Sequence, residues 1–248
     1  MAISTRDLSL LPDVARLRAA MQSMALLDAI IEPDHWLRYF SFVANFSPDG
    51  SIWLGSMQNG SGDDLVAIFN RAGCLIRGFV HESPMSPFAN DPPKVFPGIL
   101  DGVPPEFADC FTALESGWWE TVTFCVWRRY DEARWHHGDI HLPTDHCDPD
   151  GSEDLLSIYD GEPATYHRWA EDYYQPATFS LDDVVYIFEH RPLTEAVMLS
   201  LNAERFWEEL LPEVELIGYP LKGARNAGCT RRGHDEMGGS AGPGVAGG

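Results

Sequence analysis

The chain predicts an α+β fold: an antiparallel sheet of about six strands, with one helix before the sheet and a helical segment after it. Apolar residues recur at threes and fours near the N-terminus, short aromatic and β-branched runs separated by turn residues follow, and helical spacing returns in the last third. With 248 residues, 44% of them hydrophobic, the chain can bury one substantial core. We therefore expect a single domain over residues 1–220.

The first predicted element is a helix over residues 11–31. Its apolar positions follow the spacing of an amphipathic helix, and Pro33 stops it; they are Val14, Leu17, Met21, Met24, Leu27 and Ile31.

Four strands are predicted next, over residues 37–46, 51–57, 65–70 and 74–80. Each separator is rich in Gly, Asn, Asp or Ser, which favours tight turns, so the four runs read as an antiparallel meander. Residues 65–69 are apolar on both faces, and this is typical of a central strand covered on both sides.

The sheet continues after a proline-rich crossing. A short helix is predicted over residues 105–114, and two more strands over 120–128 and 134–141. These two strands and the meander together give a sheet of about six.

The pattern after His141 is helical to Leu211. Apolar spacing predicts a helix over residues 163–174. Ser180 with Asp183 forms an approximate capping box for the next helix, and Thr194 and Asn202 are expected to cap two further helices. The aromatic side chains of this segment are expected to face inward and its carboxylates outward.

Several classes are excluded by composition. Charged residues interrupt the N-terminal stretch where a signal peptide needs an apolar run, and no stretch approaches the roughly 18 apolar residues of a membrane span. We expect a cytoplasmic protein with no membrane contact.

Five scattered cysteines without a C-x-x-C spacing argue against a disulfide framework and a zinc ribbon, and Cys74 and Cys125 are expected to be buried thiols. Residues 221–248, rich in Gly, predict a disordered tail.

Acidity is the main functional signal. The net charge is −21, and residues 145–190 hold twelve acidic residues against one arginine. Nucleic acid is not an expected partner, because phosphate contacts need Lys and Arg. Instead, the outward carboxylates predict a surface that binds a basic protein; they are Asp148, Asp150, Glu153, Asp154, Glu171, Asp172, Asp182 and Asp183.

A histidine cluster offers an alternative function, a metal-dependent hydrolase that uses residues 136–147. On a strand, His137, Asp139 and His141 would share one face, and His146 follows closely. The competing interpretation is a solvated strand end, because the two outer residues would lie about 13 Å apart on a regular strand. The sequence otherwise predicts neither a cofactor nor a catalytic residue, and it favours binding over catalysis.

Two smaller motifs have structural interpretations. Asp148 and Asp150 mimic part of a calcium loop, but the pattern fits an Asp-rich turn that enters a helix better. His81 follows a predicted strand near Asp63 and Asp64, where it could act as a general base, or more simply as a hydrogen-bonded loop histidine.

The runs at residues 55–64, 78–84 and 124–130 resemble a family of uncharacterised bacterial cytoplasmic proteins, a likeness that implies no activity. In architecture and charge, the chain also resembles the SUKH-type immunity proteins that neutralise bacterial toxins. Their N-terminal Pro-x-x-Tyr-x-x-Phe-Leu pattern is absent here. This second resemblance implies an immunity-type inhibitor of a basic partner such as a nuclease toxin.

Overall fold

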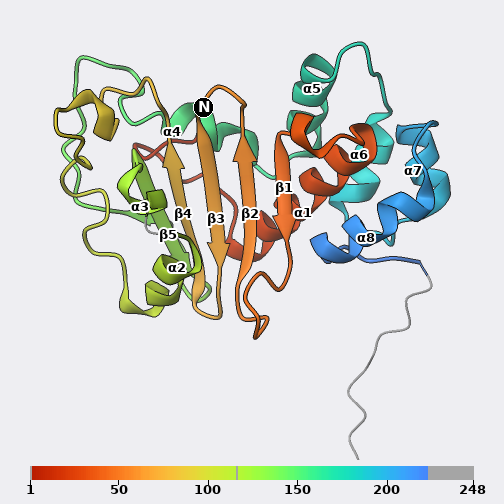
Figure 1. Ribbon diagram of the computed structural model, residues 1–248, viewed down its shortest axis with the longest axis horizontal. Coiled ribbons are helices and arrows are strands. Elements are labelled where there is room, and N and C mark those ends of the chain that lie inside the picture. Colours follow the sequence, from red (N-terminus) through yellow and green to blue (C-terminus); the bar gives the residue numbers. More distant parts are fainter. Residues whose placement is uncertain (1, 116, 223–248) are drawn as a thin grey trace, which may run out of the picture.

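The computed structural model describes residues 2–115 and 117–222. Six strands form one antiparallel sheet, in which each strand pairs with its neighbours along the chain (Figure 1). They are β1 (Phe40–Val43), β2 (Trp53–Gln58), β3 (Asp64–Phe69), β4 (Gly73–Phe79), β5 (Phe124–Arg129) and β6 (His136–His137). The α+β class with six antiparallel strands is thus confirmed.

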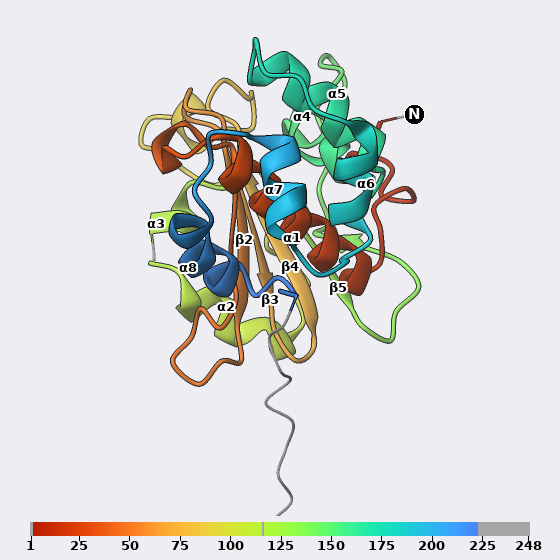
Figure 2. The same cartoon turned by 90° about the vertical axis from the view of Figure 1, so that its right-hand side faces the viewer.

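Helices pack on one face of the sheet and beyond its β1 edge, as Figures 1 and 2 show. They are α1 (Val14–Ile31), α4 (Ser152–Leu156), α5 (Pro163–Tyr173), α6 (Leu181–Phe188), α7 (Glu195–Leu201) and α8 (Trp207–Ile217). A 3-10 turn, η1 (His35–Leu37), connects α1 to β1, and η4 (Ser157–Tyr159) follows α4. This layer forms the larger of two hydrophobic clusters.

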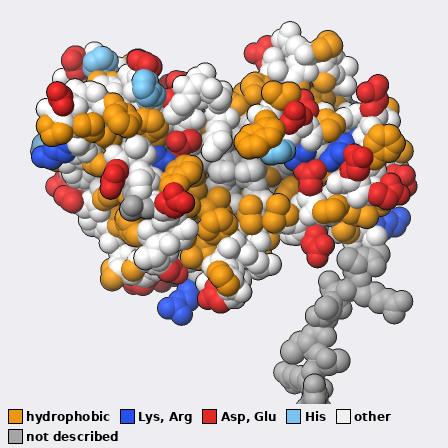
Figure 3. Space-filling view, viewed as in Figure 1, with side chains coloured by type: hydrophobic (Ala, Val, Ile, Leu, Met, Phe, Trp, Pro, Cys, Tyr) orange, Lys and Arg blue, Asp and Glu red, His pale blue; other side chains and the backbone are white. Residues whose placement is uncertain are grey.

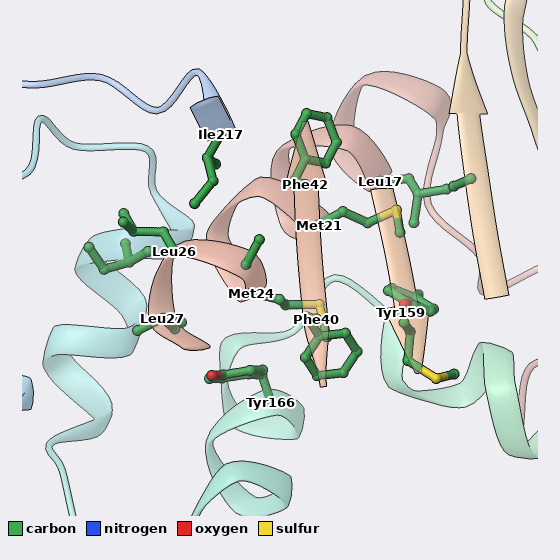
Figure 4. Close-up of a cluster of buried hydrophobic side chains, with 14 of the residues drawn as sticks. Leu17, Met21, Met24, Leu26, Leu27, Phe40, Phe42, Tyr159, Tyr166 and Ile217 are labelled. Carbon is green, nitrogen blue, oxygen red and sulfur yellow. The ribbon is translucent and has the colours of Figure 1, made fainter. Parts of the chain in front are cut away.

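Helix α1 forms as predicted, but its burial extends beyond the amphipathic stripe that its spacing predicts. Every residue from Ala20 to Ile30 is buried, because the sheet covers one side of α1 and α6, α7 and α8 cover the other. Figure 4 shows its leucines and methionines between β1, α5 and the end of α8. The buried polar side chains on α1 are hydrogen-bonded: Gln22 donates to the carbonyl of Ile217, and Ser23 to that of Ile187.

The opposite face is covered by the crossing between β4 and β5. It contains η2 (Pro87–Ala89), η3 (Pro105–Phe107), α2 (Ala108–Ala113) and α3 (Gly117–Glu120). This layer packs on Val66, Ile68, Leu75, Cys125 and Trp127 and forms the second hydrophobic cluster. Strand β3 sends Leu65 and Ala67 into the first cluster and Val66 and Ile68 into the second, so the prediction of a central strand covered on both sides is confirmed.

Boundaries differ from the prediction where tertiary contacts intervene. Strand β6 has two residues and not eight, because Gly138 packs directly on the carbonyl oxygen of Gly98, where a Cβ atom would lie 1.9 Å away. Thr194 and Ser180 cap α7 and α6 as expected. Asn202 does not cap α8: it ends α7, and its amide donates to the carbonyls of Ile30 and Ile31.

The chain after α8 returns to the helical layer. Leu221 forms a parallel bridge with Leu193, and the backbone N–H of Lys222 donates to the Leu193 carbonyl. The rest of the predicted Gly-rich tail, residues 223–248, lies outside the described residues.

Candidate functional site

A groove of about 260 Å³ lies along the outer edge of β1. Strands β1 and β2 form its floor, η1 and the end of α8 form its walls, and it reaches over the strand edge to Ala25 of α1. In the view of Figure 3, the surface is hollowed between the lobe with α2 and α3 and the lobe with α5 to α8, and β1 and β2 lie between these lobes.

The β1 edge presents backbone groups to this groove. Gln58 N–H donates to the Tyr39 carbonyl at 3.0 Å, so the antiparallel alternation turns the backbone groups of Phe40 and Phe42 away from β2. Phe40 N–H donates to the Asp28 carboxylate, and Ala44 N–H donates to the Leu216 carbonyl. The Phe42 N–H lies between these two anchored positions, on the side where the groove runs.

The walls of the groove expose large apolar side chains. Trp36 is 82% exposed and Leu216 is 53% exposed, and both line the groove. Next to them, Leu37 and Tyr173 are also exposed, and the Tyr173 hydroxyl donates to the Leu37 carbonyl at 3.3 Å. Contiguous exposed apolar side chains are typical of binding surfaces, whereas single ones are ordinary. The floor is polar by contrast: the hydroxyls of Ser41 and Ser56 are hydrogen-bonded to each other.

Two arginines hold the wall of the groove: Arg38 lines the groove and is partly buried, and Arg205 is buried outside the lining. Arg38 and Arg205 both pair with Glu213, a residue of the groove wall. Arg205 also donates to the Ala29 carbonyl, and Arg38 to the Glu32 carbonyl, so these two guanidinium groups bind carbonyls at the C-terminal end of α1. Cations are favourable at a helix C-terminus. Both arginines are therefore held by internal partners and contribute little positive charge to the surface.

Asp28 anchors the start of β1 from inside. Its carboxylate is fully buried and accepts hydrogen bonds from the backbone N–H groups of Tyr39 and Phe40 and from the Tyr166 hydroxyl. Burial raises the pKa of Asp28 to about 6, although these hydrogen bonds favour the charged form and oppose the shift. The position of the strand edge thus depends on a buried titratable group.

The eight predicted carboxylates do not act alike. Asp150 is 1% exposed and accepts hydrogen bonds from Thr5 and Ser152, so the expectation that its carboxylate faces outward is wrong. Asp148 is half-buried and accepts the N–H groups of Glu153 and Asp154, and burial raises its pKa to about 6. The interpretation of this turn as the entry to a helix is confirmed, because both residues organise the start of α4.

Other members of the set are also engaged. Asp183 accepts a hydrogen bond from Ser200, Asp172 accepts one from Gln175, and Glu171 lies 3.6 Å from the His167 ring nitrogen. Glu153, Asp154 and Asp182 are exposed, and they form no ion pair within residues 2–115 and 117–222. On the face seen in Figure 3, acidic side chains are spread over both lobes and do not form one patch.

The histidine cluster does not assemble into a metal centre. Among the residues that the structure describes, no three His, Cys, Asp or Glu side chains come together in a way that could hold an ion. His137 ends β6 and its Nδ1 bonds to the Gly138 carbonyl, while Asp139 and His141 follow outside any strand. The shared strand face on which the metal hypothesis depended is absent there, so the competing interpretation of a solvated strand end fits.

The region around His81 is also structural. His81 N–H donates to Asp63, its ring contacts Glu82, and the Ser83 hydroxyl donates to the Pro149 carbonyl. Asp64 instead pairs with Arg77, a fully buried arginine on β4. Burial raises the pKa of Asp64 even though Arg77 opposes the shift. No nucleophile and base face each other among these residues.

The remaining predictions concern cysteines and membrane contact. Cys74 and Cys125 are buried as expected, and burial raises the pKa of the Cys125 thiol to about 12. Across the described part of the chain, none of the helices has the length and apolar character needed to cross a bilayer.

Sequence reasoning missed the groove. It predicted a strand from residue 37 and gave Trp36 no role, although this tryptophan follows Pro33, Asp34 and His35 in the turn after the first helix. An exposed aromatic residue in such a turn is the only local signal of the site. The rest of the groove comes from β2 and α8, which are distant in sequence.

Comparison with known proteins gives no assignment: no family model, no curated protein and no solved structure matches the chain.

Proposed function

We propose that this protein acts by binding a basic protein partner, with the groove along β1 at the centre of the contact. The observation that carries the proposal is the cluster of exposed apolar side chains at the edge of an incompletely paired strand. Aromatic residues next to a concave surface are the usual anchors of protein interfaces. Edge strands with free backbone groups also accept segments of other chains.

The charge around the groove supports a basic partner. Exposed carboxylates lie on the elements that border it, in the turn before η1, at the end of α5 and on α8: they are Asp34, Asp172, Glu208, Glu209 and Glu215, of which Glu209 pairs with Arg205. Arg38 lines the groove and Arg205 is buried near it, but both are paired with Glu213, and 11% and 3% of their side-chain surface is exposed. A positive surface would meet a negative field here, which accelerates encounter and disfavours acidic partners.

The predicted acidic helices extend this field and do not form the contact by themselves. Glu153, Asp154 and Asp182 remain exposed on α4 and α6 and add long-range attraction. An immunity-type inhibitor of a basic toxin such as a nuclease is the narrower form of the proposal. It is supported by the acidic surface, because a protein that binds phosphates presents the cations that such a surface attracts.

The test is affinity capture from the host with the full chain and two variants. Trp36→Ala with Leu216→Ser removes the exposed anchors of the groove, and Leu199→Ser, at a position that is 43% exposed on α7, is the matched control. Wild type and control should retain a basic protein that is released as salt rises from about 50 to about 500 mM. The groove variant should lose it. Retention by all three proteins, or capture of no basic protein by wild type, contradicts the proposal.

A further inference from the structure

At the other end of the sheet, a second cleft collects positive charge in a strongly acidic protein. It has a volume of about 340 Å³ and lies between the N-terminal segment and the β5–β6 hairpin. Three arginines and one histidine line it: they are Arg6, Arg128, Arg134 and His137. With 17 Lys and Arg against 38 Asp and Glu in the chain, three arginines in one cleft are a strong local reversal of sign.

These arginines form no ion pair with any carboxylate in the described residues. Backbone carbonyls position two of them instead: Arg6 donates to Cys147 and His146, and Arg128 Nε donates to Glu132. Carbonyl oxygens fix a guanidinium group without cancelling its charge. Arg134 is exposed.

The neighbouring residue on β5 shows the contrast. Arg129 points to the opposite face of the sheet and pairs with Glu106 and Glu132. Arg128 points into the cleft, where Asp7 is the one acidic residue in the lining, and the Asp7 carboxylate accepts the backbone N–H of Ser9. Against one carboxylate, the three arginines leave the cleft with an excess of positive charge.

Apolar side chains form one wall of the cleft. Leu11 and Trp135 are 3% and 7% exposed, and the Trp135 indole donates to the Pro12 carbonyl at 2.7 Å. This hydrogen bond ties the N-terminal segment to the start of β6 and fixes one wall. Leu8 adds a third apolar side chain to the lining. A mostly fixed concave site with an apolar wall and a few convergent polar groups is typical of small-molecule sites.

We infer that this cleft binds a small organic oxyanion, a phosphate or a carboxylate attached to an apolar group. Arg134 and the terminal nitrogens of Arg128 hold the oxyanion, since the planar guanidinium fork matches the geometry of both anions. The apolar group lies against Leu8, Leu11 and Trp135. Macromolecular anions such as nucleic acid do not fit this inference, because the remaining surface is acidic and repels an extended polyanion.

The experiment is calorimetric titration of the full chain with three probes: phenyl phosphate, benzoate and inorganic phosphate. We expect saturable binding of phenyl phosphate or benzoate, weakened by salt, and at least about tenfold weaker binding of inorganic phosphate, which lacks the apolar group. The stronger of the two aromatic probes identifies the anion type. If inorganic phosphate binds as tightly as both aromatic probes, the apolar wall does not contribute to binding, and the inferred apolar part of the ligand is wrong.

The variants test the arginines. Arg134→Gln should weaken the better aromatic probe by about tenfold or more, and Arg128→Gln with Arg134→Gln by about a hundredfold, because each removes a charge-assisted contact. Arg168→Gln is the matched control, since it changes the same charge at an exposed position on α5 and should bind like wild type. The inference is overturned if no probe binds wild type below about 10 mM, or if the double variant binds as tightly as the control.

Discussion

The two ends of the sheet use arginine in opposite ways. At the β1 end, Arg38 and Arg205 are paired with Glu213 and donate to the carbonyls at the end of α1. At the β6 end, Arg128 and Arg134 line a cleft without an ion pair to any described carboxylate. The surface near β1 is therefore left with exposed apolar and acidic side chains, and the surface near β6 gains local positive charge. One acidic chain thus offers two surfaces of opposite sign.

Because the arginines at the two ends of the sheet differ in pairing, net charge does not describe the individual sites of this protein. A net charge of −21, if it were spread evenly over the surface, would attract cations everywhere. Which arginines are neutralised depends on the elements that meet. Helix α8 brings two carboxylates, Glu209 and Glu213, to Arg38 and Arg205. The cleft near β6 holds one carboxylate, Asp7, against three arginines.

Substitution of Arg205 by Ala should have the largest effect on stability among the changes at the two ends of the sheet. Removal of its guanidinium group leaves Glu213 with one partner and the Ala29 carbonyl without its donor, so the free energy of unfolding should fall by about 3–5 kcal/mol. Urea unfolding measures the loss. Arg134→Ala, at the opposite end and exposed, should change it by less than about 0.5 kcal/mol. Equal losses of unfolding free energy in the two variants would show that the paired Arg205 contributes no more to stability than the unpaired Arg134.

The β1 end should also depend on pH through Asp28. Its pKa is raised from 3.8 to about 6 in the folded protein, so its contribution to stability is full below about pH 4 and is lost as the pH rises through 6. From pH 4 to pH 7, wild type should lose on the order of 3 kcal/mol relative to Asp28→Asn. Unfolding curves of both proteins across this range measure the difference.

Asp145→Asn, which alters an exposed carboxyl group in the loop before α4, is the control for Asp28→Asn. Its profile should follow that of wild type. A constant difference between wild type and Asp28→Asn at every pH would show that Asp28 does not titrate in this range.

The third substitution, Asn202→Ala, removes the side-chain amide that donates to the carbonyls of Ile30 and Ile31 at the end of α1. We expect a loss of about 1–2 kcal/mol in unfolding free energy, because two carbonyls lose their donor. Asn202→Asp retains the acceptor for Glu204 N–H but loses the donor, so it should be at least as destabilising. An unchanged stability in both variants would show that α1 does not need this capping contact.

The smallest effect should separate the neighbours Arg128 and Arg129. Each substitution by Gln removes one positive charge, but only Arg129→Gln breaks ion pairs, which are partly exposed. Arg129→Gln should lower the free energy of unfolding more than Arg128→Gln does at low salt, and this difference should shrink as salt screens the pairs. Urea unfolding at two salt concentrations measures this difference in stability. A difference of zero at low salt would show that the ion pairs of Arg129 do not contribute to stability.

Local signals determined most of the fold. Turn residues between short apolar runs predicted β1 to β4, the two-sided apolarity of residues 65–69 predicted a central strand, and Ser180 and Thr194 capped the expected helices. Such features depend on neighbours in sequence, so a single chain reveals them. The same local signal misled at α1, because amphipathic spacing does not show that a second layer will cover the polar side.

The sites were decided by tertiary structure. Asp150 resembles the exposed carboxylates around it in sequence but is buried and accepts a hydrogen bond from Thr5, which is distant in sequence. The groove joins Trp36 to Leu216, and the arginine cleft joins Arg6 to Arg134. A sequence states which side chains carry charge or apolar surface. Only the packed elements decide which are exposed, paired or brought together, because those properties depend on contacts between residues more than a hundred positions apart.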